Sequence, residues 1–131
     1  MTEFEQVIRF NREILGIKAR PHGLQTFDEA RLSYTQMAEE AQEFLDAHQV
    51  GDLVGCIDAC IDCMVFTMGI LYKMGITEEE YKTIFKVVMD ANMTKSAGQN
   101  ASRTGFGSAT DAVKPKEFVP PEHIIRDIIS E

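Results

Sequence analysis

The sequence predicts an all-α fold, an antiparallel bundle of four to five helices with a long C-terminal loop. Apolar residues recur at a helical period along four long segments, and no segment alternates apolar and polar residues as a strand does. With 131 residues, the chain fits one domain spanning residues 1–131, in which residues 96–131 are a loop-rich extension containing most of the prolines.

Five helices are expected from the apolar period and from signals at the helix ends. They cover residues 3–15, 29–48, 52–74, 77–92 and 123–129. Gly16 and Gly75 end the first and third helices, because glycine readily takes the conformation that terminates a helix. Thr26 or Asp28 caps the second helix with a side-chain oxygen. The turn after His48 is so short that the second and third helices are expected to be antiparallel neighbours.

The second and fourth helices each carry an apolar face that is expected to contact the core. On the second helix this face comprises Leu32, Tyr34, Met37, Ala38, Ala41, Phe44 and Leu45. On the fourth helix it comprises Tyr81, Ile84, Phe85, Val88 and Met89.

The third helix holds an energetic anomaly, because Leu53–Tyr72 contains only two charged residues, Asp58 and Asp62. A carboxylate in an apolar segment is costly unless it is neutralised, and two carboxylates four residues apart share a helix face and repel each other. A nearby cation is the simplest remedy. The window is long enough to span a membrane, but its two acids and Gly69 argue against that interpretation, and no membrane contact is expected.

The composition limits the kinds of molecule that the protein is expected to bind. The net charge is −8, from 13 basic and 21 acidic residues, which argues against binding to nucleic acid or to a membrane surface. Phosphates can still reach an acidic site through divalent metals. The N-terminus lacks the basic region and apolar run of a signal peptide, and the three cysteines resemble small apolar residues of a reducing compartment, so a cytoplasmic location is expected.

Carboxylates of two neighbouring helices are predicted to converge. Glu40 and Glu43 share a face of the second helix, and Asp58 and Asp62 share a face of the third. Glu43 and Asp58 each lie about six residues from the connecting turn, so their heights along the bundle match. Four such carboxylates need cations, and their hard oxygens favour Mg²⁺ or Mn²⁺. For Glu39, Glu40 and Glu43 taken alone, a solvated helix face is the alternative.

The end of the fourth helix carries Asn92 and Lys95. A lysine that follows an amide residue at a helix end can reach a phosphate held by metals. The alternative is structural, since Asn terminates helices and Lys compensates the helix dipole.

Together these motifs resemble the all-α nucleoside triphosphate pyrophosphohydrolases, the MazG-like superfamily. Glu39–Glu43 is similar to its Glu-Glu-x-x-Glu motif, and Ile57–Asp62 looks like the Asp-Ala-x-x-Asp variant of small phage members. Asp90–Lys95 is similar to the Ser-Asn-Met-x-Lys segment of the superfamily. The resemblance covers residues 4–121, and it extends to phage enzymes that act on dGTP.

The resemblance departs from the usual pattern at one position. The second motif commonly reads Glu-x-x-Asp, whereas the residue three before Asp62 is Ala59. Asp58, four residues before Asp62, is therefore expected to supply the ligand, and its shorter side chain leaves the number of metals open.

The resemblance implies hydrolysis between the α and β phosphates of a nucleoside triphosphate, such as dGTP or another purine deoxynucleotide. It implies the following roles: metal ligands Glu40, Glu43, Asp58 and Asp62 for Mg²⁺ or Mn²⁺; proton acceptor Glu39; phosphate-binding groups Asn92 and Lys95; base-pocket residues Phe10 and Asn11. Related enzymes are homodimers or homotetramers, which bury the apolar faces of the second to fourth helices. The tail around Arg103, Lys114 and Lys116 either closes over phosphates or is a solvated loop.

Two other classes of function stay open from the sequence. One is a non-catalytic helical oligomer that binds nucleotide or metal. The other is a structural helical protein in which Asp58 and Asp62 pair with basic residues.

Overall fold

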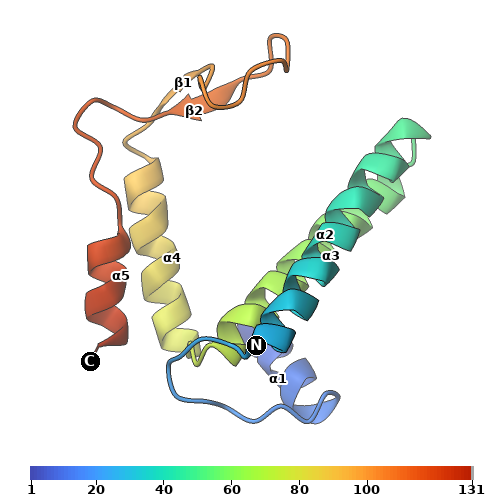
Figure 1. Cartoon of the computed structure of the whole chain (residues 1–131), viewed down its shortest axis with the longest axis vertical. Helices are drawn as coiled ribbons and strands as arrows, with labels where there is room; N and C mark the ends of the chain where they lie inside the picture. Colours follow the sequence, from blue (N-terminus) through green and yellow to red (C-terminus); the bar gives the residue numbers. More distant parts are fainter. Residues whose placement is uncertain (131) are drawn as a thin grey trace. The chain divides into compact units, whose positions relative to one another are not determined.

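The computed structural model describes residues 1–130, and the expected all-α class is confirmed (Figure 1). In chain order the elements are α1 (Glu3–Glu13), α2 (Phe27–Gln49), α3 (Leu53–Lys73), α4 (Glu78–Asn92), β1 (Ser96–Gly98), β2 (Asp111–Val113) and α5 (Glu122–Ile129). Contacts group the chain into two compact units, Met1–Glu78 and Glu79–Glu131, and each is described by itself.

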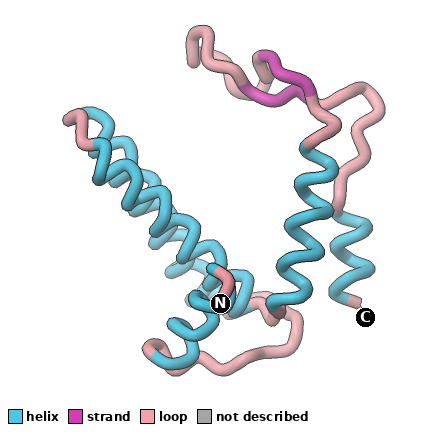
Figure 2. Tube along the Cα trace, turned by 180° about the vertical axis from the view of Figure 1, so that it is seen from behind, coloured by secondary structure: helices cyan, strands magenta, loops and turns pink. Residues whose placement is uncertain are grey.

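The first unit is built on the antiparallel α2–α3 hairpin, whose helices run side by side in both views (Figures 1 and 2). The turn between them depends on Gly51, which adopts a φ of +72° that other residues rarely take. Asp52 then caps α3 by accepting a 2.9 Å hydrogen bond from the backbone N–H of Gly55. The predicted antiparallel pairing of the second and third helices is therefore confirmed.

Capping boxes set the start of α1 and α2. Thr2 accepts from the backbone N–H of Glu5, and Thr26 accepts from that of Glu29. Thr26, and not Asp28, is therefore the cap of α2. The hydroxyl of Thr2 also donates a 2.9 Å hydrogen bond to Glu78 Oε1, which ties the start of α1 to the end of this unit.

The buried core of the first unit lies where α1 packs on α3 and where α3 packs on α2. Its buried apolar side chains are Phe4, Val7, Ala59, Met68 and Tyr72. Asn11 of α1 and Ser33 of α2 are buried polar residues of the same unit. This core orients α1 across one end of the hairpin.

Much of the apolar face expected on α2 is not covered by residues 1–130. Leu32, Tyr34, Phe44 and Leu45 are all exposed, and Ser33 is the one buried residue of that helix. On α4, Phe85 and Met89 are likewise exposed, and no residue of Glu78–Asn92 is buried. The expected core contacts of these faces are therefore made only in part within residues 1–130, by half-buried residues such as Met37, Ile84 and Val88. By length and composition α3 alone, among helices of this part of the chain, could cross a membrane.

The second unit contains α4, a β-hairpin and α5. β1 and β2 pair antiparallel, with Ser96 opposite Val113 and Gly98 opposite Asp111. α4 and α5 run side by side in both views (Figures 1 and 2), and residues of both helices line one cavity of about 200 Å³. The hairpin corrects the expectation of a loop without strands. Each strand has three residues and includes no long apolar alternation, so the sequence pattern carried no strand signal.

Candidate functional site

The predicted carboxylates lie on the two facing helices of the α2–α3 hairpin. Glu40 and Glu43 belong to α2, and Asp58 and Asp62 belong to α3. Glu40 and Asp62 are half-buried, whereas Glu43 and Asp58 are exposed. The hairpin therefore presents two carboxylates at its interior edge and two nearer solvent.

Glu40 and Asp62 line one cavity together with apolar side chains. This cavity measures about 360 Å³, and its walls are Phe10, Glu40, Asp62, Val65 and Phe66. Phe66 lies four residues after Asp62, so it occupies the same face of α3 one turn further along. Phe66 was not predicted as a lining residue, although its i+4 spacing from Asp62 was the signal that could have identified it.

Glu40 has the strongest electrostatic anomaly of the hairpin. Desolvation is the main cause that raises its pKa from 4.5 to about 7, followed by Glu43, Asp62 and Asp58. Its Oε2 atom is buried and has no hydrogen-bond partner among the described residues. Three carboxylates therefore act on Glu40 from two helices. This agrees with the matching heights predicted for them, and it leaves an unsatisfied oxygen facing inward.

The carboxylates are electrostatically close but do not form a closed cage. Among residues 1–130, no group of three or more His, Cys, Asp or Glu side chains is placed to hold a metal ion. The donor set nevertheless fits a hard divalent cation, since all its atoms are carboxylate oxygens. The unpartnered Oε2 of Glu40 offers one open ligand position. Glu39 is exposed on α2 and is not among the groups that raise the pKa of Glu40.

A second, smaller cavity adjoins the first at Phe10. It measures about 50 Å³ and is lined by Phe10, Asn11, Leu15, Gln36, Val65, Phe66, Gly69, Ile70 and Lys73. Phe10, Val65 and Phe66 border both cavities, so they connect the acidic residues to the α1 side of the hairpin. An aromatic ring and apolar walls of this kind suit a planar ligand.

Asn11 supplies a buried polar group to that smaller cavity. Its side chain is 4% exposed, and its Nδ2 donates a 2.9 Å hydrogen bond to the carbonyl of Val7. Its Oδ1 accepts no hydrogen bond within residues 1–130. A Cβ at Gly69 would lie 3.3 Å from Asn11 Nδ2, so glycine is what allows Asn11 to sit this close to α3.

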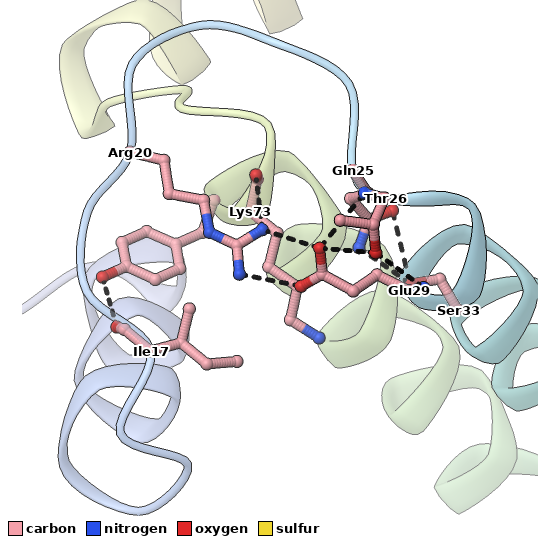
Figure 3. Close-up of polar contacts among 8 residues, drawn as sticks. Ile17, Arg20, Gln25, Thr26, Glu29, Ser33 and Lys73 are labelled. Atoms are coloured by element: carbon pink, nitrogen blue, oxygen red, sulfur yellow. Dashed lines mark hydrogen bonds and ion pairs between the residues drawn. The ribbon is translucent and has the colours of Figure 1, made fainter.

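A polar cluster holds the segment between α1 and α2 against the hairpin (Figure 3). Arg20 binds Glu29 through two hydrogen bonds of 3.1 and 2.7 Å, and it donates a third, of 3.5 Å, to the carbonyl of Lys73. The Tyr72 hydroxyl donates a 2.8 Å hydrogen bond to the carbonyl of Ile17. These contacts join α3 to the chain that follows α1, and so they fix the placement of Asn11.

Asn92 and Lys95 belong to the second unit. The side chain of Asn92 contacts Met89 through a 3.8 Å N–H···S contact, and the backbone N–H of Lys95 donates to Asn92. Lys95 Nζ lies 5.4 Å from the centre of the Phe118 ring. Lys95 is half-buried, and it is one of the positive groups that lower the pKa of Asp111. The contact with Phe118 was not expected from the sequence, since nothing in the loop pattern linked residues 95 and 118.

Comparison with known proteins adds one match. Residues 2–92 match the family model described as phosphoribosyl-ATP pyrophosphohydrolase. The matched range contains Asn11, all the carboxylates of the hairpin and Asn92, and it ends three residues before Lys95. No curated protein matches the chain.

Proposed function

The chain belongs to the phosphoribosyl-ATP pyrophosphohydrolase family, within the MazG-like superfamily of all-α nucleoside triphosphate pyrophosphohydrolases, and we propose that it releases pyrophosphate from a purine deoxynucleoside triphosphate. Membership implies the reaction type, hydrolysis of a nucleotide with release of pyrophosphate. The base and the sugar are the proposed part. We take dGTP as the first substrate to test.

The observation that carries the proposal is the state of Glu40. A half-buried carboxylate with an unpartnered oxygen and three carboxylates acting on it is costly in a packed hairpin. A structural role gives no reason to retain such a group. A site that neutralises it with bound cations does give one.

Enzymes of this family generally use Mg²⁺, and we propose that Glu40, Glu43, Asp58 and Asp62 hold Mg²⁺ or Mn²⁺ here. When bound, the metal offsets the charge of the phosphates and lowers the pKa of a water molecule. Asp62 and Glu40 face the cavity, so they are the inner ligands. Glu43 and Asp58 are exposed and approach from the solvent side.

The remaining predicted residues are assigned to proton transfer and to phosphate binding. We propose that Glu39 accepts the proton of the attacking water, because it neighbours Glu40 and is exposed on α2. Asn92 and Lys95 bind phosphate oxygens: Asn92 donates the N–H groups of its amide, and Lys95 supplies a positive charge. The apolar walls around Phe66 limit the water that reaches the reacting phosphate.

The base is proposed to lie in the adjoining cavities, against the ring of Phe10. Asn11 lines the smaller of them, and its Oδ1 is the atom available to accept a hydrogen bond, because its Nδ2 already donates to the carbonyl of Val7. An acceptor at this point suits an N–H group on the edge of a base, which guanine, adenine and cytosine all carry. We take dGTP as the first of these to test, because the chain resembles enzymes that act on it.

We further propose that the chain assembles as a homodimer or homotetramer through its exposed apolar surface. On α3, Leu53, Ile57, Ile61 and Met64 follow a helical stripe and are 71%, 55%, 53% and 50% exposed. Exposed apolar area of this extent on one face is typical of a protein interface. Sedimentation or light scattering of the purified chain tests the assembly, and a monomer at micromolar concentration contradicts it.

A pyrophosphate-release panel tests the function itself. All NTPs and dNTPs, together with phosphoribosyl-ATP, are incubated with the protein and Mg²⁺ or Mn²⁺, and the products are identified. We expect monophosphate and pyrophosphate, with dGTP turned over fastest. Release of single phosphates contradicts the reaction type. Binding of nucleotides without any product favours the alternative, a non-catalytic nucleotide- or metal-binding helical oligomer.

A further inference from the structure

Two lysines flank the outer end of the β-hairpin of the second unit. In the antiparallel register Ser96 is opposite Val113, and Lys95 and Lys114 are the next residues outward from this pair. Like charges at neighbouring positions of a strand pair are destabilising. An uncharged residue at either position would remove this repulsion.

The side chains of both lysines contact the ring of Phe118. Lys95 Nζ lies 5.4 Å from the ring centre and Lys114 Nζ lies 5.1 Å from it, within the range of cation–π contacts. Phe118 is brought back towards the hairpin by a tight turn, in which its backbone N–H donates to the carbonyl of Pro115 at 3.1 Å. One half-buried aromatic side chain thus positions two ammonium groups.

Among residues 1–130, neither Lys95 nor Lys114 forms an ion pair. Asp111, the single acidic residue between positions 95 and 114, is bound to Arg103, and Lys95 is only the last of the groups that lower its pKa. The same stretch carries three basic residues in a chain whose net charge is −8. A local excess of positive charge in an acidic protein attracts an anion.

We propose that Lys114 is a second phosphate-binding residue, which acts with Lys95 on the pyrophosphoryl part of the substrate, and that Phe118 is the positioning residue for both. This inference rests on the proposed function, since Lys95 is the phosphate-binding lysine there. Two ammonium groups suit the two phosphorus centres of a pyrophosphoryl group, because each acts as a point charge with rotatable donors.

The test is to titrate the full-length protein with inorganic pyrophosphate, with and without Mg²⁺, and to measure the binding affinity by isothermal titration calorimetry. Lys114→Ala and Lys95→Ala are each expected to weaken binding by about tenfold, as for the loss of a hydrogen bond to a charged group. Lys116→Ala is the matched control. It removes the same charge two residues away, outside the contact with Phe118, and is expected to change binding by less than about twofold.

The role of Phe118 has its own readout. Phe118→Leu keeps both lysines but removes the ring, and it is expected to weaken pyrophosphate binding, whereas Phe118→Tyr keeps the ring and retains the wild-type affinity. Thermal unfolding shows whether each variant is folded. If Lys114→Ala unfolds at a lower temperature than the wild type, Lys114→Arg serves as a second variant. It keeps the positive charge, so it is expected to bind pyrophosphate if that charge is what binds the anion.

The outcomes separate this inference from the proposed function. If the wild-type protein hydrolyses a nucleotide but Lys114→Ala matches Lys116→Ala in pyrophosphate affinity and in KM, the role of Lys114 is overturned. If the wild-type protein releases no pyrophosphate from any nucleotide yet binds the anion through Lys114, the proposed function fails and the anion site stands.

Discussion

Two glutamates on α2, Glu29 and Glu40, lie about three helical turns apart and have opposite electrostatic surroundings. Glu29 accepts hydrogen bonds from Arg20 and from Thr26, and these lower its pKa from 4.5 to about 2 (Figure 3). Glu40 is desolvated and faces three carboxylates, which raise its pKa to about 7. The same residue type on the same helix is thus held as an anion at one end and pushed towards the neutral acid in the middle.

On the proposed function, this difference separates a structural region from the metal site. Around Glu29 the partners are complementary, so the cluster stabilises the fold and is complete without a ligand. Around Glu40 the partners are of like charge, so the cluster opposes folding unless a cation binds. If this interpretation is correct, changes at Glu40 alter activity and metal binding, whereas changes at Glu29 alter stability alone.

The largest effect is expected from removing the charge of the inner carboxylates. Glu40→Gln and Asp62→Asn should each reduce pyrophosphate release by more than about 100-fold, because each removes a ligand from ions that stabilise the transition state by several kcal/mol. Turnover is measured at saturating Mg²⁺, and circular dichroism shows that the fold is kept. Asp46→Asn is the control, since Asp46 is an exposed acid of α2 bound to Gln42. Wild-type rates in both variants would mean that the site is elsewhere.

A smaller effect is expected at Asp58. Its side chain is exposed, and it is the last of the groups that raise the pKa of Glu40. Asp58→Asn should lower kcat/KM by about tenfold, since an outer ligand contributes less to metal affinity than an inner one. A full loss of activity in this variant would indicate that Asp58 is an inner ligand. An unchanged rate would indicate that Asp58 does not bind the metal.

The pH dependence of stability should differ with and without metal. The pKa of Glu40 is higher in the folded chain, about 7, than its ordinary value of 4.5, so the folded state holds the proton more tightly. Without metal, its contribution to stability is present below pH 4.5 and is lost as the pH rises through about 7. Mg²⁺ competes with that proton, so the stabilisation by Mg²⁺ should grow over this interval and raise Tm by several degrees at pH 8.

Thermal melts of wild type and Glu40→Gln, with and without Mg²⁺, measure this linkage. The variant has no proton to lose at this position, so its metal-free Tm should be less dependent on pH, and its response to Mg²⁺ should be weaker. An equal response to Mg²⁺ in both proteins argues that the cation binds away from Glu40.

The smallest effect on function is expected at Glu29. Its pKa is lowered in the folded chain, so the stability it contributes is present above pH 4.5 and is lost as the pH falls towards about 2. Glu29→Gln should lower Tm by a few degrees at neutral pH and leave kcat unchanged. Asp28→Asn is the matched control, because Asp28 is 93% exposed and its ion pair with Arg31 is long, at 3.8 Å. A loss of turnover in Glu29→Gln would contradict the separation of the two regions.

Local signals predicted much of the fold and of the site. Thr26 caps α2 and Gly75 follows α3 because side-chain oxygens and φ values above zero act within a few residues. The helical period placed Glu40 with Glu43 and Asp58 with Asp62, and the short turn brought the two pairs to the same height. The β-hairpin was missed, because three-residue strands of Ser, Ala and Gly leave no periodic trace.

The sequence by itself determined which residues are helical and which faces they share, because these follow from period and spacing along the chain. Only the tertiary structure decided that Glu40 is desolvated, that Asn11 is buried beside Gly69, and that Phe118 holds Lys95 and Lys114 together. Those features depend on contacts between segments far apart in the sequence. Burial and pKa are set by all the atoms that surround a group, and not by its neighbours along the chain.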